Sequence, residues 1–227
     1  MQEFFDLWDI YQKVVAADYM FHREIGADVR RELRARIAGQ PFSFLDLGCG
    51  DAATLVPVVK GLALKRYRGV DLSESALALA NKNLATLPCP VELIHGDLST
   101  ALTEDTASYD VIYSSFALHH LPTHEKADFF RRAARRLDGA ALLLLVDVIR
   151  KEDESLQAYH LHYCDWLRSS WTSLDTHEMD LACEHVVNND LPEPFTVLQA
   201  QALAAGFGKT RQVACYNWHQ GLCITRA

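Results

Sequence analysis

Short apolar runs alternate with amphipathic stretches through the middle of the chain, from residue 42 to residue 148. Unbroken apolar runs predict strands buried on both faces, and apolar positions at three- and four-residue steps predict helices. We expect strands at residues 42–47, 66–71, 91–95, 109–114 and 140–147. Helices are expected at residues 52–63, 74–86 and 123–137, with a loop after residue 95. This alternation predicts a parallel sheet covered by helices on both faces.

The two flanks of this alternating segment have different patterns. Apolar residues from Phe4 to Val15 recur at helical spacing, and a second helix is expected over residues 19–38. Residues 151–190 are rich in aromatic residues and histidines and poor in β-branched residues, which predicts two inserted helices. A short helix over residues 195–205 and two closing strands at residues 209–217 and 221–226 complete the pattern. Because no flexible linker separates these segments in the sequence, we expect one domain over residues 1–227.

Composition narrows the class of protein. The chain has 227 residues, of which 49% are hydrophobic and 23% charged, as in an ordinary globular domain. Its net charge of −8 repels phosphate backbones and predicts no nucleic-acid partner. The six cysteines form no CxxC pair, the start of the chain does not resemble a signal peptide, and the longest apolar run is too short to cross a bilayer. We therefore expect a cytoplasmic protein without a membrane partner, as a monomer or homodimer.

The turn after the first predicted strand is the most informative segment. Asp46 is followed there by Gly48 and Gly50, just before a helical pattern begins. Two glycines at such a place predict a tight strand-to-helix turn whose backbone a ligand can approach closely. Acidic residues also follow the next two strands, at Asp71 and Asp97. Because ligands of open parallel sheets bind beyond the carboxyl ends of the strands, these residues predict one binding edge.

Together with Ser115 at the end of the fourth strand, these residues resemble the motifs of class I S-adenosylmethionine (SAM) methyltransferases. The resemblance covers residues 42–150 well. It implies SAM as the cofactor and an α/β, Rossmann-like fold: a seven-stranded, mostly parallel sheet with an antiparallel last strand and helices on both faces. The N-terminal helices and the insert at residues 151–195 are expected to form a lid on the substrate side.

The resemblance assigns cofactor contacts to single residues. Gly48 and Gly50 would run along the methionine part of SAM, and Asp46 would help to hold its amino group. Asp71, with Leu72 beside it, would accept hydrogen bonds from both ribose hydroxyls, which suits a carboxylate. A helix cap is the alternative role for Asp71.

Further contacts are implied for the adenosine and the methyl end. Asp97 would accept a hydrogen bond from the adenine amino group, with Leu98 packed on the ring, unless Asp97 is an ordinary turn residue. Ser115 would contact the cofactor, and Phe116 would form one wall of the adenosine pocket. Tyr19 lies where related enzymes place an aromatic lid, although a simple contact between helices is an alternative.

One residue departs from the family's commonest loop, which has a third glycine where Ala52 stands. Because alanine does not need a positive φ, we expect a modest change of the turn at this position.

His119 and His120 are weak candidates for a catalytic base, because a histidine titrates near neutrality. Packing is the alternative role for this pair. We expect no metal site. The closely spaced His160 and His162 would point about 200° apart on the expected helix and could not share an ion.

The resemblance implies an enzyme that transfers the methyl group of SAM to a small-molecule acceptor by in-line displacement. One alternative is a SAM-modifying enzyme, because the helical layout and the ending Cys215–Leu222 are similar to carboxy-SAM synthase. We find no clear counterpart of that enzyme's carboxylate-binding arginine. An NAD-dependent oxidoreductase is a second alternative, because Gly48–Ala53 satisfies GxGxxA. A non-catalytic SAM-binding protein is the third.

Overall fold

The sheet determines how the site is built. A computed structural model describes residues 2–37 and 39–226, without the side chains of residues 2–8 and Ala140. Within these residues seven strands form one sheet in the order β3-β2-β1-β4-β5-β7-β6. Their bounds are β1 (Phe42–Leu47), β2 (Leu64–Asp71), β3 (Val91–His95), β4 (Tyr109–Ser115), β5 (Leu137–Val148), β6 (Lys209–Tyr216) and β7 (His219–Thr225). β1 to β5 are parallel and β7 is antiparallel to both neighbours, which confirms the predicted fold class.

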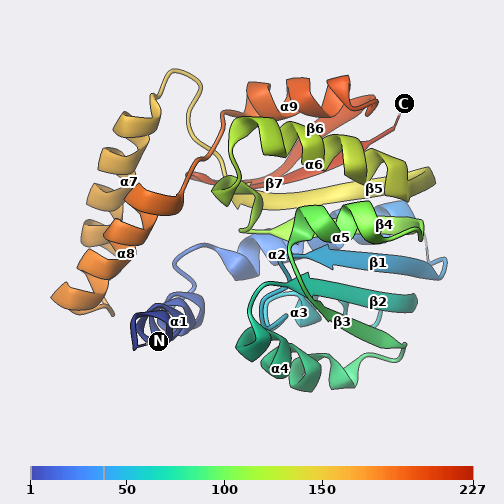
Figure 1. Cartoon of the computed structure of the whole chain (residues 1–227), viewed down its shortest axis with the longest axis horizontal. Helices are drawn as coiled ribbons and strands as arrows, with labels where there is room; N and C mark the ends of the chain where they lie inside the picture. The colour runs from blue at the N-terminus through green and yellow to red at the C-terminus, as the bar shows by residue number, and fades with distance from the viewer. Residues whose placement is uncertain (1, 38, 227) are drawn as a thin grey trace.

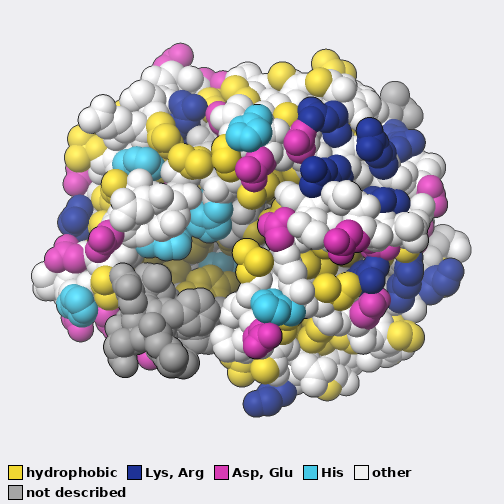
Figure 2. Space-filling view, viewed as in Figure 1, with side chains coloured by type: hydrophobic (Ala, Val, Ile, Leu, Met, Phe, Trp, Pro, Cys, Tyr) yellow, Lys and Arg dark blue, Asp and Glu magenta, His cyan; other side chains and the backbone are white. Residues whose placement is uncertain are grey.

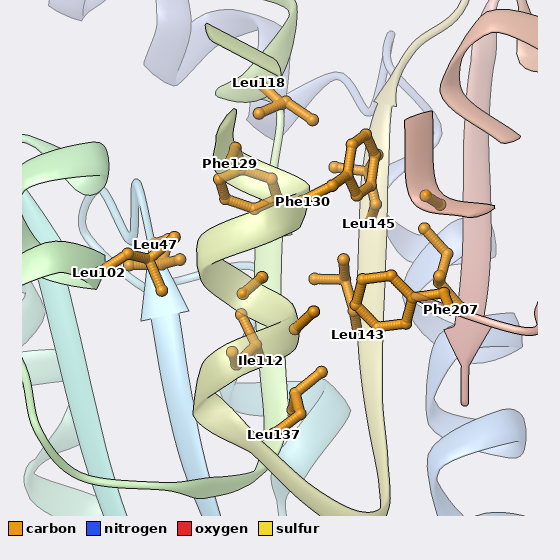
Figure 3. Packing of buried hydrophobic residues seen from close by; sticks show 14 of the residues in the cluster. Leu47, Leu102, Ile112, Leu118, Phe129, Phe130, Leu137, Leu143, Leu145 and Phe207 are labelled. Carbon is orange, nitrogen blue, oxygen red and sulfur yellow. The ribbon is translucent and has the colours of Figure 1, made fainter. Parts of the chain in front are cut away.

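Helices cover both faces of this sheet (Figure 1). One face carries α5 (Leu98–Glu104), α6 (Thr123–Arg136) and α9 (Phe195–Ala204). The other carries α2 (His22–Ile37), α3 (Val56–Val59) and α4 (Glu74–Asn83). On the first face, Phe129 and Phe130 of α6 are fully buried in the cluster that contains Leu143 and Leu145 of β5 (Figure 3). Burial on both faces is why the central strands contain unbroken apolar runs.

A third group of helices lies at the end of the sheet where the parallel strands finish (Figure 1). It consists of α1 (Gln2–Ala16), α7 (Leu156–Ser170) and α8 (Thr176–Asn189). These helices share a separate apolar cluster with Val148 at the end of β5 and Trp218 before β7. The expected two-helix insert is therefore present, and it packs on the N-terminal helix beyond the strand ends.

Two sequence predictions were wrong. The expected helix over residues 52–63 is reduced to the single turn of α3, because turns occupy most of residues 50–55 and Gly61 takes a positive φ of 73° just after it. The expected loop after β3 contains α5 instead. Its N-cap is Asp97, whose carboxylate accepts hydrogen bonds from the backbone N–H groups of Ser99 and Thr100. Burial of Leu102 in the core adds a tertiary contact that the local pattern did not show.

Candidate active site

The loop between β1 and α3 brings its backbone unusually close to the next motif. Gly48 has a φ of 75°, and a Cβ atom there would lie 2.5 Å from Cβ of Ala117. Gly50 also has a positive φ, of 53°, and a Cβ there would meet open space. Gly48 is therefore required by packing, whereas Gly50 leaves an uncovered backbone that a ligand can approach.

The expected change of the turn at Ala52 was wrong. It adopts a φ of 57°, the left-handed conformation that a glycine would take there, and it is buried. The backbone N–H of Ala52 donates to the carbonyl of Cys49 at 2.9 Å, which holds this conformation. The loop keeps the turn, and alanine bears a strain of about 1–2 kcal/mol.

Asp71 at the end of β2 ties this loop to the sheet. Its Oδ2 accepts a hydrogen bond from the N–H of Gly50 at 2.8 Å, and its Oδ1 accepts one from the N–H of Ser73 at 2.9 Å. Ser73, not Asp71, is the N-cap of α4. Each carboxylate oxygen can accept a further hydrogen bond, so a ribose contact stays compatible with these two. The neighbouring side chain of Leu72 is 68% exposed, which leaves an apolar surface beside the carboxylate.

Asp97 and Leu98 lie at the start of α5, across the strand ends from Asp71. The capping hydrogen bonds use Oδ1 of Asp97, at 2.9 Å to the N–H groups of Ser99 and Thr100. Leu98 is partly buried and packs against the core cluster. Asp97 therefore has a structural role, and its contact with adenine stays a prediction.

Asp46 is buried beneath the glycine loop. Tyr67 donates its hydroxyl to Oδ2 of Asp46 at 2.7 Å, whereas Oδ1 has no hydrogen-bond partner among the described residues. Burial raises the pKa of Asp46 to about 7, against the lowering effect of the Tyr67 hydrogen bond. A buried oxygen without a partner suits a ligand that brings a donor, such as the amino group of SAM. With the open backbone at Gly50 and the exposed Leu72, this edge fits that cofactor.

The end of β4 turns sharply toward the helices. Phe116 has a φ of 51°, which is rare for an aromatic residue, and its N–H donates to the carbonyl of Val146 at 2.8 Å. Its ring lies 5.0 Å from the ring of His22, centroid to centroid. Strained backbone of this kind gathers at functional sites. Ser115 is the last residue of β4, half-buried beside Phe116.

Tyr11 is a residue that the sequence analysis missed, and it lies near the carboxylates of Asp51 and Asp71. Burial raises the pKa of Tyr11, and the carboxylates of Asp51 and Asp71 raise it further. The next residue, Gln12, donates a hydrogen bond to Oδ2 of Asp51 at 3.2 Å, which places this part of α1 beside the glycine loop. The available signal for Tyr11 was its position on the apolar face of α1, which the sequence analysis interpreted as helix packing.

Tyr19 makes a contact between helical segments. Its ring stacks on Trp171, 5.4 Å away and nearly parallel, and its hydroxyl accepts a hydrogen bond from the N–H of Ser173 at 2.8 Å. These contacts anchor the segment after α1 to the segment after α7. Its contact with the cofactor stays a prediction.

A cavity of about 340 Å³ lies between α1, α7, α8 and the ends of β4 and β5. Its walls are mostly apolar and include Val14, Leu167, Trp171 and Val186. Phe116, just after β4, and Tyr11 of α1 also line it. Figure 2 shows this hollow from outside, with histidine side chains around it. The aromatic insert therefore does form a pocket beside the strand ends.

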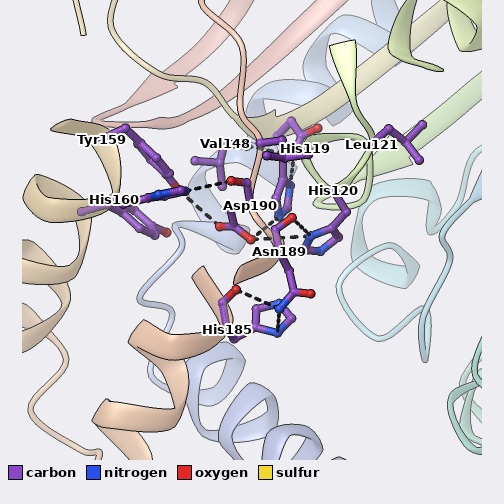
Figure 4. A network of polar contacts seen from close by, with 12 residues as sticks. His119, His120, Leu121, Val148, Tyr159, His160, His185, Asn189 and Asp190 are labelled. Atoms are coloured by element: carbon purple, nitrogen blue, oxygen red, sulfur yellow. Dashed lines mark hydrogen bonds and ion pairs between the residues drawn. The ribbon is translucent and has the colours of Figure 1, made fainter. Parts of the chain in front are cut away.

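One end of the cavity is polar, and the histidine pair lies there with Asp190 (Figure 4). Nδ1 of His119 is paired with the carboxylate of Asp147, at the end of β5. Burial lowers the pKa of His119, but the carboxylates of Asp147 and Asp190 outweigh burial and raise it. Burial, together with the charge of His119, lowers the pKa of His120 to about 3. The pKa of His119 is therefore above its usual value, and His120 is neutral at pH 7.

The second histidine pair behaves as expected from its helical spacing. His160 contacts the backbone carbonyl of Asp190 at 2.9 Å, while His162 pairs with Glu154 at 2.8 Å. The two side chains face different neighbours and do not form a common site.

A family comparison matches residues 44–139 to the profile of a methyltransferase domain. That segment contains the glycine loop, the acidic strand ends and the turn with both histidines. The chain carries a class I SAM-dependent methyltransferase domain. The dehydrogenase alternative relied on the same glycine loop, which this match assigns to the methyltransferase family. No helix in the described part of the chain is long and apolar enough to span a membrane.

Curated relatives of the methyltransferase domain cover very different shares of the chain. Carboxy-S-adenosyl-L-methionine synthase from Campylobacter concisus is 21% identical over 216 residues, which are 92% of this chain and 86% of the relative. Release factor glutamine methyltransferase from Caulobacter vibrioides is 38% identical over 33% of this chain, but this is only 26% of its own length. The chain thus spans most of one relative and about a quarter of the other.

Solved structures show how far the fold extends. Magnesium protoporphyrin IX methyltransferase from Synechocystis PCC 6803 with bound SAH has a TM-score of 0.65 at 18% identity, covering 98% of this chain and 94% of that one. An O-methyltransferase family protein from Burkholderia thailandensis has a TM-score of 0.65 at 15% identity, covering 94% and 57%. The SAM-binding methyltransferase fold therefore includes the helical segments outside residues 44–139.

Proposed function

We propose that this protein transfers the methyl group of SAM to a small, largely apolar acceptor with one nitrogen or oxygen nucleophile. The observation that carries the proposal is the cavity between α1, α7 and α8. Its volume of about 340 Å³ suits a small molecule, and its apolar walls end in a single polar cluster. Apolar walls and a net charge of −8 do not favour an RNA acceptor.

The residues have separate tasks in this reaction. When bound, SAM supplies an electrophilic methyl carbon. Asp46, Asp71 and the backbone at Gly50 would hold the cofactor at the strand ends. Trp171 and its apolar neighbours would exclude water and align the acceptor, which is most of what such a displacement requires. The polar cluster at His119 would orient the nucleophilic atom of the acceptor.

A reaction of the carboxy-SAM synthase type is the second candidate, because that relative covers nearly the whole chain. It would bring a carboxylate into the site, which calls for a cationic side chain. No lysine or arginine is present among the described residues that line the cavity. This difference favours methyl transfer.

Methyl-labelled SAM with a panel of aromatic alcohols and amines tests the proposal. We expect an acceptor that gains one methyl group while SAM is converted to its demethylated product, both seen by mass spectrometry. A cofactor product that gains a carboxyl group would replace the proposal with the second candidate. Calorimetry that shows no SAM binding would reject both.

A further inference from the structure

Three side chains converge at the polar end of the cavity with the spacing of metal ligands. His119, His120 and Asp190 each offer one ligand atom within 4.8 Å of the others. Nε2 of His119 and Nδ1 of His120 both lie 3.5 Å from Oδ1 of Asp190 (Figure 4). This is longer than the usual hydrogen bond of about 2.7–3.2 Å. Two ligands on one tetrahedral zinc ion, each about 2.0–2.2 Å from the metal, lie roughly 3.3–3.6 Å apart.

Asp190 has an oxygen that the protein does not satisfy. The residue is 4% exposed, and Oδ1 has no hydrogen-bond partner among the described residues. Its other oxygen, Oδ2, accepts a hydrogen bond from Tyr159 at 3.3 Å. A buried carboxylate oxygen without a partner is costly unless a cation meets it. The unpaired oxygen is the one that faces both histidines.

The neighbours of these three residues orient them as in known metal sites. His119 turns Nδ1 to the carboxylate of Asp147, which leaves Nε2 facing Asp190. Asp147 is itself held, because its Oδ1 accepts the N–H of Val148 at 2.9 Å. A carboxylate behind a ligating histidine is the usual outer partner of a protein-bound metal. A backbone hydrogen bond also holds the segment of Asp190 beside that of His119, because the N–H of Leu191 donates to the carbonyl of His119 at 2.8 Å.

We propose that His119, His120 and Asp190 bind one divalent transition-metal ion, with zinc as the expected occupant. Two imidazoles and one carboxylate, without a thiolate, form a donor set used by catalytic zinc and by non-haem iron. On binding, Nδ1 of His120 exchanges its long contact of 3.3 Å with the carbonyl of Asn189 for the metal. The nearby ammonium of Lys126 is directed to the backbone oxygens of Leu121 and Leu191, not to the ligands.

The ion would leave a coordination position on the cavity side, where the ring of His185 lies 5.5 Å from that of His120. That position would take the nitrogen or oxygen of the acceptor. This role rests on the proposed function, whereas the metal site itself does not. The ligands come from two distant segments of the chain, which is why sequence analysis expected no metal.

Zinc binding to the metal-free full chain tests the site. Calorimetry should show one zinc ion per chain, and His120→Gln and Asp190→Asn should each weaken it more than about 100-fold, beyond the usual cost of outer-shell changes. The side chain of His120 is the most exposed of the three, at 39% against 6% for His119 and 5% for Asp190, so its substitution should disturb folding least. The matched control is His124→Gln, whose side chain is 79% exposed and which should bind zinc like the native chain.

X-ray absorption at the zinc edge should show only nitrogen and oxygen ligands at about 2.0–2.2 Å. A sulfur shell near 2.3 Å would place the zinc on cysteines and overturn the proposal. The proposal would also be overturned if both His120→Gln and Asp190→Asn bound zinc as tightly as the unsubstituted chain. It would likewise be overturned if the unsubstituted chain bound no zinc. SAM binding is measured on the same samples. A native chain that binds SAM but no zinc refutes the metal site alone, and a native chain that binds zinc but no SAM refutes the proposed function alone.

Discussion

The edge proposed to bind SAM, called the cofactor edge below, and the cavity proposed for the acceptor are neighbours at the carboxyl ends of the strands, but they are built differently. The cofactor edge consists of residues within a few positions of a strand end, such as Asp46, Gly48 and Asp71, and much of it is backbone. The cavity is assembled from side chains between Ile10 and Asp190 that meet only through helix packing. The cofactor edge should therefore respond to backbone changes, and the cavity to changes of side-chain volume.

The largest expected effect is on the cofactor edge, from Gly48→Ala. A left-handed φ costs alanine about 1–2 kcal/mol, and overpacking against Ala117 costs about 1–3 kcal/mol more. The free energy of unfolding should fall by about 3 kcal/mol, and SAM binding should be lost. Urea unfolding and calorimetry measure the two effects.

Gly61→Ala is the matched control, because Gly61 has a φ of 73° but a Cβ there would meet no atom within 4 Å. It should cost only about 1–2 kcal/mol and leave SAM affinity unchanged. Equal losses in both variants would show that the close approach to Ala117 is unimportant.

On the cavity side, Val186→Phe should fill the space of the acceptor. Val186 lines the cavity, whereas the next residue, Val187, is 51% exposed on the outside of α8. We expect kcat/KM for the acceptor to fall more than tenfold, about 1.4 kcal/mol, with SAM affinity unchanged. Val187→Phe should leave both unchanged. Loss of SAM affinity in Val186→Phe would show that the two regions are not separable.

The pH dependence of SAM binding isolates the contribution of Asp46. Its pKa of about 7 in the free protein lies above the usual carboxyl value, so its stabilising effect is present at low pH and lost as the pH rises through 7. A cationic amino group favours the ionised carboxylate. SAM affinity should therefore rise roughly tenfold between pH 6 and pH 8.

Asp46→Asn cannot ionise and should flatten this pH profile, which calorimetry at both pH values measures. It should also remove the loss of stability that Asp46 causes in the free protein as the pH rises. An unchanged pH slope in Asp46→Asn would assign the dependence to another group.

The smallest expected effect comes from Ala52→Gly, which relieves the left-handed strain in the cofactor loop. Stability should rise by up to about 1 kcal/mol, because the strain of about 1–2 kcal/mol is offset by lost burial of one methyl group. Thermal unfolding measures the change. A fall in stability would mean that packing of the Ala52 methyl outweighs the strain.

Strand positions could be predicted because burial on both faces requires a continuous apolar run. β1 and β3 have the bounds that the pattern predicted, and β2 begins two residues earlier. Helices next to the site were harder. α5 depends on the cap at Asp97 and on burial of Leu102, and the loop before α3 is held by the hydrogen bond from Gly50 to Asp71 of β2. Local periodicity contains neither kind of information.

The sequence by itself determined the fold class and which residues gather at the carboxyl edge of the sheet, because parallel strands must end at one edge and their flanking residues must meet there. Only the tertiary structure decided how the cavity is built. It placed Tyr11 beside Asp51, turned Tyr19 onto Trp171, and brought Asp190 to His119 and His120. Those contacts depend on how α1, α7 and α8 pack, and an apolar helix face does not specify which partner it will meet.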